Sequence, residues 1–133
     1  MRYLAINVNG RDPRIIDALC DFSKSIETRG RTTGYYERLK GLWIALVKTG
    51  TNDPDNGHVF ALAHVYDVID MRGENVKKAL QHMTRLDPDS PYWGNQTGLY
   101  FDSVQVLERP EKVHVYPSCW YSVELPYEIW SAK

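Results

Sequence analysis

The sequence predicts an α+β fold, a mainly antiparallel and partly closed β-barrel of about six strands with two flanking helices. Three observations predict it: most apolar segments have strand character, only two have helical spacing, and short turns separate the late strands. Strands and helices do not alternate strictly, as they would in a doubly wound fold. The chain has 133 residues and no linker or low-complexity tract, so residues 1–133 are expected to form a single domain.

Strands are expected where apolar residues alternate with polar ones or form short runs, and helices where they recur every three or four positions. The strand-like segments are residues 4–8, 42–47, 58–71, 99–107, 112–116 and 119–125, and residues 26–29 are also expected to be extended. Helices are expected over residues 12–23 and 73–86. Turns are expected at Arg109-Pro110 and at residues 117–118, and the apolar segment Tyr127–Trp130 is expected to dock on the body of the protein.

The first helix has the clearest signals. Asp12 is a favourable N-cap, and Pro13 suits the first helical position. The apolar residues of this segment share one face that should pack on a sheet, and they are Ile15, Ile16, Leu19, Cys20 and Phe22.

Bulk properties exclude several classes of function. The formal net charge is −1, so no global field draws the protein to nucleic acid or to a membrane. No run reaches the roughly 20 apolar residues of a membrane span, and the N-terminus lacks the apolar core of a signal peptide, so a cytoplasmic location is expected. Cys20 and Cys119 are the only cysteines, and both are expected to be buried small hydrophobes.

The common cofactor motifs are absent. The sequence contains no glycine-rich nucleotide loop, zinc-protease, serine-hydrolase or calcium-loop pattern, and no cofactor is expected. The four histidines have no metal-ligand spacing, so no metal site is expected either.

The segment from Lys24 to Lys48 is locally basic, with six lysine and arginine residues against two glutamates. A segment this basic in a near-neutral chain predicts a one-sided site for an anion, although a solvated loop with counter-charges elsewhere is an equal alternative. At its start, the run Lys24–Arg29 follows the first helix. If the run is extended, Lys24, Ile26 and Thr28 face one way, and Ser25, Glu27 and Arg29 face the other.

The run Lys24-x-x-Glu27-x-Arg29 resembles the signature of ASCH domains, a branch of the PUA-like superfamily. The order of the later segments is similar as well. The family has a turn followed by an apolar strand, which resembles Arg38–Gly41 with Leu42–Val47 here. Its next, long strand resembles Val59–Val68. Its strand ending in proline resembles Leu99–Pro110, and its closing strand resembles Trp120–Leu125.

This resemblance implies a PUA-like barrel with a cleft between a helix and the barrel, in which RNA or a modified nucleotide binds. One enzymatic branch removes an acyl group from N-acylated cytidine with a lysine and a threonine three residues later. Lys24 matches that lysine, but Glu27 stands at the threonine's position and Thr28 follows it. Other members are described as ribonucleases, in which a lysine, an arginine and a glutamate could cleave without metal.

The leading hypothesis is a domain that binds RNA, other single-stranded nucleic acid or a modified nucleotide above the Lys24–Arg29 segment. Lysine and arginine side chains would bind phosphate, and Glu27 would form hydrogen bonds with a base edge. Aromatic side chains would stack on bases. The candidate residues are Lys24, Ser25, Glu27, Thr28, Arg29, Arg31, Tyr35, Lys40, Tyr92 and Trp93.

Three alternatives stay open. The same cleft could belong to a ribonuclease or an amidohydrolase, with Lys24 and Glu27 as catalytic groups. The protein could instead be a protein-interaction module, such as an inhibitor of a nucleic-acid enzyme. The charged run could also be a structural ion-pair network that ties the helix to the barrel, and the loop aromatics could pack under their own loops.

Overall fold

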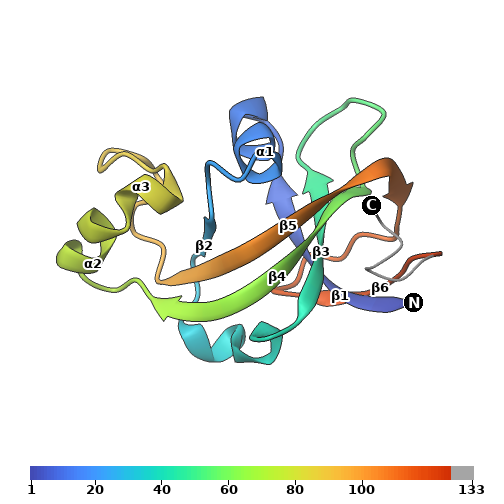
Figure 1. The fold of residues 1–133 in the computed structure, drawn as a ribbon. Helices are drawn as coiled ribbons and strands as arrows, with labels where there is room; N and C mark the ends of the chain where they lie inside the picture. Colours follow the sequence, from blue (N-terminus) through green and yellow to red (C-terminus); the bar gives the residue numbers. More distant parts are fainter. Residues whose placement is uncertain (127–133) are drawn as a thin grey trace.

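The computed structural model describes residues 1–126, so the expected docking of Tyr127–Trp130 lies outside the described residues. Within these described residues, six strands form one mixed sheet in the order β2-β5-β4-β3-β1-β6 (Figure 1). Their bounds are β1 Arg2–Asn9, β2 Ile26–Arg29, β3 Trp43–Thr49, β4 His58–Asp70, β5 Thr97–Lys112 and β6 Tyr121–Glu124. Only β1 and β3 pair in parallel, and the other four pairings are antiparallel, as predicted.

The helices are short. They are α1 Pro13–Cys20, α2 Glu74–Ala79 and α3 Gln81–Thr84, with single turns of 3₁₀-helix at η1 Thr33–Tyr35 and η2 Glu37–Leu39. Figure 1 shows α2 and α3 together beyond the ends of β4 and β5, with α1 apart from them. None of the helices in the described part of the chain has the length and apolar composition needed to cross a membrane.

Apolar side chains cover both faces of the sheet. In β3, Ile44 and Leu46 belong to one buried cluster, whereas Ala45 and Val47 belong to another, because successive residues of a strand face opposite ways. The first cluster includes Phe101 and is covered by the apolar stripe of α1. The second contains residues of β1, β3, β4, β5 and β6, and β6 pairs with β1 so that Arg2 lies opposite Glu124.

The sheet curls without closing into a barrel. β2 and β1 are separated by three strands in the sheet order, yet the Arg29 Nη2 donates to the main-chain oxygen of Asn7. A second side-chain bond joins the segments next to these strands, since Trp120 Nε1, just before β6, donates to the main-chain oxygen of Tyr35 in η1 at 3.1 Å. Side chains therefore bridge the seam that no strand pairing closes in residues 1–126.

The first helix begins as predicted and ends earlier. The Asp12 carboxylate accepts from the Arg14 amide at 3.1 Å, and Pro13 is the first helical residue. The prediction that the helix extends to residue 23 is wrong, because Phe22 has a φ of 64° and an exposed side chain. A left-handed residue with a bulky side chain cannot continue an α-helix.

The predicted helix over residues 73–86 is divided in two. Leu80, with φ −101° and ψ 9°, ends α2 and precedes α3, and the left-handed Arg85 ends α3. The buried side chain of Lys77 joins α2 to the neighbouring segments, because its Nζ donates to the main-chain oxygens of Met71 and Asn95. Two short helices anchored by a lysine replace the single amphipathic helix.

The turn predicted at Arg109-Pro110 is wrong. β5 continues through Pro110 to Lys112, and the separate strand predicted over residues 112–116 does not form. Val59 pairs with Glu111 and Ala61 with Val106, so the register shifts there and the residues between are bulged out of the ladder. Proline has no amide hydrogen to donate to a neighbouring strand. It is tolerated at such a bulge because a bulged residue makes no hydrogen bond in the ladder.

Candidate functional site

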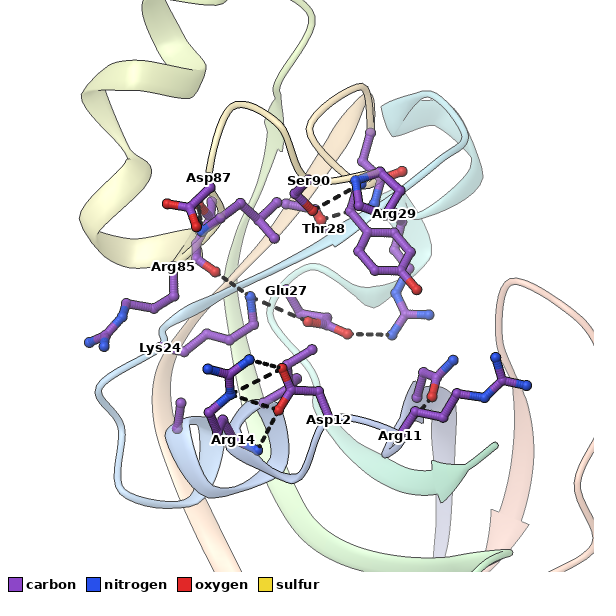
Figure 2. A pocket seen from close by; sticks show the side chains of 18 of the residues that line it. Arg11, Asp12, Arg14, Lys24, Glu27, Thr28, Arg29, Arg85, Asp87 and Ser90 are labelled. Carbon is purple, nitrogen blue, oxygen red and sulfur yellow. Dashed lines mark hydrogen bonds and ion pairs between the residues drawn. The ribbon is translucent and has the colours of Figure 1, made fainter. Parts of the chain in front are cut away.

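A cleft of about 790 Å³ opens over strand β2. Three segments line it: the end of β1 with the start of α1, the β2 strand with Lys24 and Gly30, and the loop of residues 85–95 that follows α3. Figure 2 shows Lys24, Glu27 and Arg29 in a row across the middle, with Asp12 and Arg14 on one side and Asp87 and Ser90 on the other. The cleft thus lies between α1 and the 85–95 loop.

The central row, formed by Lys24, Glu27 and Arg29, is a carboxylate between two cations. Glu27 Oε1 lies 3.5 Å from Lys24 Nζ, and Glu27 Oε2 accepts from Arg29 Nη2 at 3.0 Å. The side chains are 4 %, 13 % and 23 % exposed in chain order, so the row becomes more open toward Arg29. These contacts confine the carboxylate to one orientation on the cleft floor.

The expectation that Lys24 and Glu27 face opposite ways is wrong. β2 begins only at Ile26, so the alternation of a strand does not extend back to Lys24. The Lys24 amide donates to Ala18 O at 3.0 Å, which places this residue at the end of the α1 segment. From there the long side chain reaches across to Glu27, while Ile26 is buried beside Gly98.

Lys24 is held by main-chain oxygens as well as by Glu27. Its Nζ donates to Ile26 O at 2.8 Å and to Thr84 O at 2.6 Å. Burial lowers the pKa of this ammonium, and the nearby Glu27 carboxylate opposes that shift. Because two carbonyls and a carboxylate surround Nζ, the ammonium joins β2 to the end of α3.

The guanidinium of Arg29 has fewer of its hydrogen-bond donors paired than the ammonium of Lys24 has. Its Nη2 contacts Glu27 and the Asn7 oxygen, but its buried Nε has no hydrogen-bond partner among the described residues. A guanidinium has five donor hydrogens, and those of its two terminal nitrogens that remain unpaired are available to an acceptor in the cleft.

The rim carries further charges that sequence patterns did not single out. The lining contains five basic and four acidic residues in all. Asp12 and Arg14 pair at 2.8 Å, whereas Arg11 and Arg85 form no ion pair with any described residue. The anion site predicted from the basic segment is therefore not a one-sided basic surface, and its free cations come from elsewhere in the chain.

The structure brings five of the ten predicted residues to this cleft. Lys24, Glu27, Thr28, Arg29 and Tyr92 line it, and the Tyr92 side chain is exposed. Tyr92 lies in the 85–95 loop, which places one aromatic ring at the rim.

The other five predicted residues do not line the cleft. Arg31 lies 4.8 Å over the Tyr35 ring, and Lys40 Nζ pairs with Asp67 at 3.2 Å. Trp93 donates to the Glu74 carboxylate, and Ser25 is held by main-chain bonds to Met83 and Phe101, with none of the five among the lining residues. Much of the predicted basic segment therefore has local partners, as the alternative reading expected.

Sequence reasoning missed the contributions of the α1 start and of the loop after α3. The missed residues are Asn9, Arg11, Asp12, Arg14, Arg85, Asp87, Asp89, Ser90 and Asn95. The N-cap at Asp12 marked a helix start, where polar groups gather, but nothing local showed that it faces a loop more than 70 positions away.

Residues 1–126 contain no group of three or more His, Cys, Asp or Glu side chains placed to hold a metal ion. Cys20 and Cys119 are free thiols and both are half-buried. The cleft offers a ligand its ion-pair row, its arginines and its main-chain groups.

The comparisons with known proteins concern the fold. No protein-family model and no curated protein matches the sequence. The crystal structure of ASCH from Zymomonas mobilis superposes with a TM-score of 0.60 at 17 % sequence identity, over 82 % of this chain and 72 % of that one. The expected likeness to ASCH domains is thus confirmed at the level of the fold, and the chain has an ASCH-like α+β fold.

Proposed function

We propose that this protein binds single-stranded RNA or a nucleotide in the cleft over β2. The observation that carries the proposal is a carboxylate fixed between two cations on the floor of a cleft of about 790 Å³, with unpaired arginines at its rim. A fixed acceptor suits base recognition, and free guanidinium groups suit phosphate. The ASCH-like fold supports a nucleic-acid ligand in general terms.

The proposed roles of the cleft side chains depend on whether each one already has an ion-pair or hydrogen-bond partner in the protein. Arg11 and Arg85 have no ion-pair partner in the described residues and would meet phosphate. Glu27 would accept from a base, and Tyr92 would stack on it, since stacking contributes about 1–3 kcal/mol per base. Lys24 is surrounded by protein acceptors and would position Glu27 rather than contact phosphate.

Replacing Arg85 or Arg11 by alanine should weaken RNA binding at every sequence and lower the salt dependence. Each phosphate contact that is lost should reduce the slope of log affinity against log salt by roughly one. The measurement is fluorescence anisotropy of labelled RNA and DNA oligonucleotides at several salt concentrations.

Arg2→Ala is the matched control, because Arg2 lies at the opposite end of β1 from Asn9 and pairs with Glu124. Its affinity and salt slope should equal those of the unchanged protein. The proposal fails if the unchanged protein binds no oligonucleotide at low salt, or if its affinity is indifferent to salt.

A second candidate is a hydrolase at the same cleft, acting on RNA or on an N-acylated cytidine. One observation favours it: an ammonium and a carboxylate, Lys24 and Glu27, lie 3.5 Å apart on the cleft floor, and such groups serve as acid and base in hydrolysis. Turnover of RNA or N4-acetylcytidine that is lost in Glu27→Gln but kept in Arg2→Ala would support the hydrolase. Binding without turnover would support the binding domain.

A further inference from the structure

The floor of the cleft includes an open strand edge. Within residues 1–126, β2 is the end strand of the sheet, so one of its edges has no neighbouring strand there. Its other edge pairs antiparallel with β5 from Ile26 to Arg29, and the Phe101 amide donates to Ser25 O at 2.8 Å just before the strand begins. Hydrogen-bonded pairs alternate along such a ladder. The main-chain groups of Ile26 and Thr28 therefore point away from β5, to the open edge.

Only part of this edge is occupied. Lys24 Nζ donates to Ile26 O and blocks that acceptor. The N–H and the C=O of Thr28 have no partner on this edge among the described residues. Thr28 is one of the residues that line the cleft, the space that a ligand would fill. Main-chain N–H and C=O groups are strong hydrogen-bonding groups that gain most when they find a partner away from water.

We propose that the main chain of Thr28 reads the edge of a nucleobase. In an extended residue the N–H and C=O lie side by side on the same edge of the strand. The Watson–Crick edge of every base offers an acceptor beside a donor, such as N3 beside the N4 amino group of cytosine. The Thr28 N–H donates to the base acceptor, and the Thr28 C=O accepts from the base N–H. This assignment rests on the proposed function and names the group that recognises the base.

The length of the free edge favours a base over a peptide. A peptide that adds to a sheet pairs with several residues in succession. Here Lys24 blocks the edge at Ile26, so one residue is free within β2. One donor and one acceptor match the adjacent groups of a base.

Neighbouring side chains hold Thr28 in position. Asn95 Nδ2 donates to Thr28 Oγ1 at 3.0 Å, which ties β2 to the 85–95 loop. Tyr92 of the same loop also lines the cleft, where its ring can cover a base seated on Thr28. A recognition group that is already held in place loses little conformational entropy on binding.

The test removes the Thr28 N–H without changing the ladder. Proline has no amide hydrogen and is tolerated on an edge strand where that hydrogen is unpaired, so Thr28→Pro should fold. Thr28→Val is the matched control, because it loses the same hydroxyl and keeps the N–H. Affinities for hexacytidylate and hexauridylate are measured for both variants by anisotropy. Thr28→Pro should bind about tenfold or more weakly than Thr28→Val, the loss expected for one buried hydrogen bond.

A second measurement covers the case in which Thr28→Pro does not fold. In the unchanged protein, saturating hexacytidylate or hexauridylate should shift the Thr28 amide resonance and slow its hydrogen exchange. Equal affinities of the two Thr28 variants, or a Thr28 amide that the bound RNA leaves unchanged, would overturn the inference while the proposed function stands. A failure of the unchanged protein to bind either RNA would overturn both.

Discussion

Replacing Lys24 with methionine should lower the free energy of unfolding by about 3–5 kcal/mol, the usual cost of removing one partner from a buried ion pair. The ammonium is almost fully buried and contacts Glu27, Ile26 O and Thr84 O. Methionine fills the space but leaves both carbonyls without their donor. Urea unfolding at pH 7, followed by circular dichroism and by tryptophan fluorescence, measures the change.

Lys40→Met is the matched control. Lys40 also forms an ion pair, with Asp67 at 3.2 Å, but that pair is exposed. Exposed pairs contribute roughly 0–1 kcal/mol, so this variant should be nearly as stable as the unchanged protein. Equal losses in the two variants would mean that the buried contacts of Lys24 do not hold β2 to the end of α3.

Replacing Gly98 with alanine should destabilise the protein by about 1–3 kcal/mol, as overpacking of a filled core does. A Cβ at this position would lie 2.9 Å from Ile26 Cγ2 and 3.2 Å from Met71 Cγ and Sδ. Ile26 and Met71 are buried, so neither can move aside freely. Because Ile26 adjoins Glu27, the displaced strand should also weaken RNA binding. Thermal unfolding and the anisotropy titration measure the two effects.

Gly34→Ala provides the comparison for this change. Nothing lies within 4 Å of a Cβ at Gly34, in the single turn η1. This variant should be unchanged or slightly more stable, because alanine restricts the unfolded chain. If Gly98→Ala is as stable as Gly34→Ala, the close approach between β2 and β5 has room to relax.

Local signals predicted the elements whose stability is local. Alternation in β1, the N-cap at Asp12 and the apolar run of β3 each depend on residues near in sequence, and each is confirmed. The break at Leu80 and the passage of β5 through Pro110 could not be predicted in this way. Both regions contact other segments: Lys77 in α2 donates to the main-chain oxygens of Met71 and Asn95, and Pro110 lies where the register of β5 against β4 shifts.

The same distinction between local and distant contacts separates the parts of the candidate site that the sequence predicted from those that it did not. The short motif at Lys24, Glu27 and Arg29 identified the cleft floor, because these residues are close in sequence. The rim could not be predicted, since Arg11 and Arg85 reach the cleft only after α1 and the 85–95 loop have packed around β2. The exposed basic residues Arg31 and Lys40 looked equally suitable in the sequence, but the fold gives each a nearby partner.

The pairing of β1 with β6 has a consequence for how the chain folds. Arg2 and Glu124, which face each other across this pair, are 122 positions apart. On a ribosome, β1 therefore waits for more than a hundred further residues before its outer edge is covered. An uncovered edge strand is a template for pairing with other chains, so this interval is when the nascent protein is most exposed to aggregation. The long loop that must close also favours slow folding, because contacts distant in sequence form late.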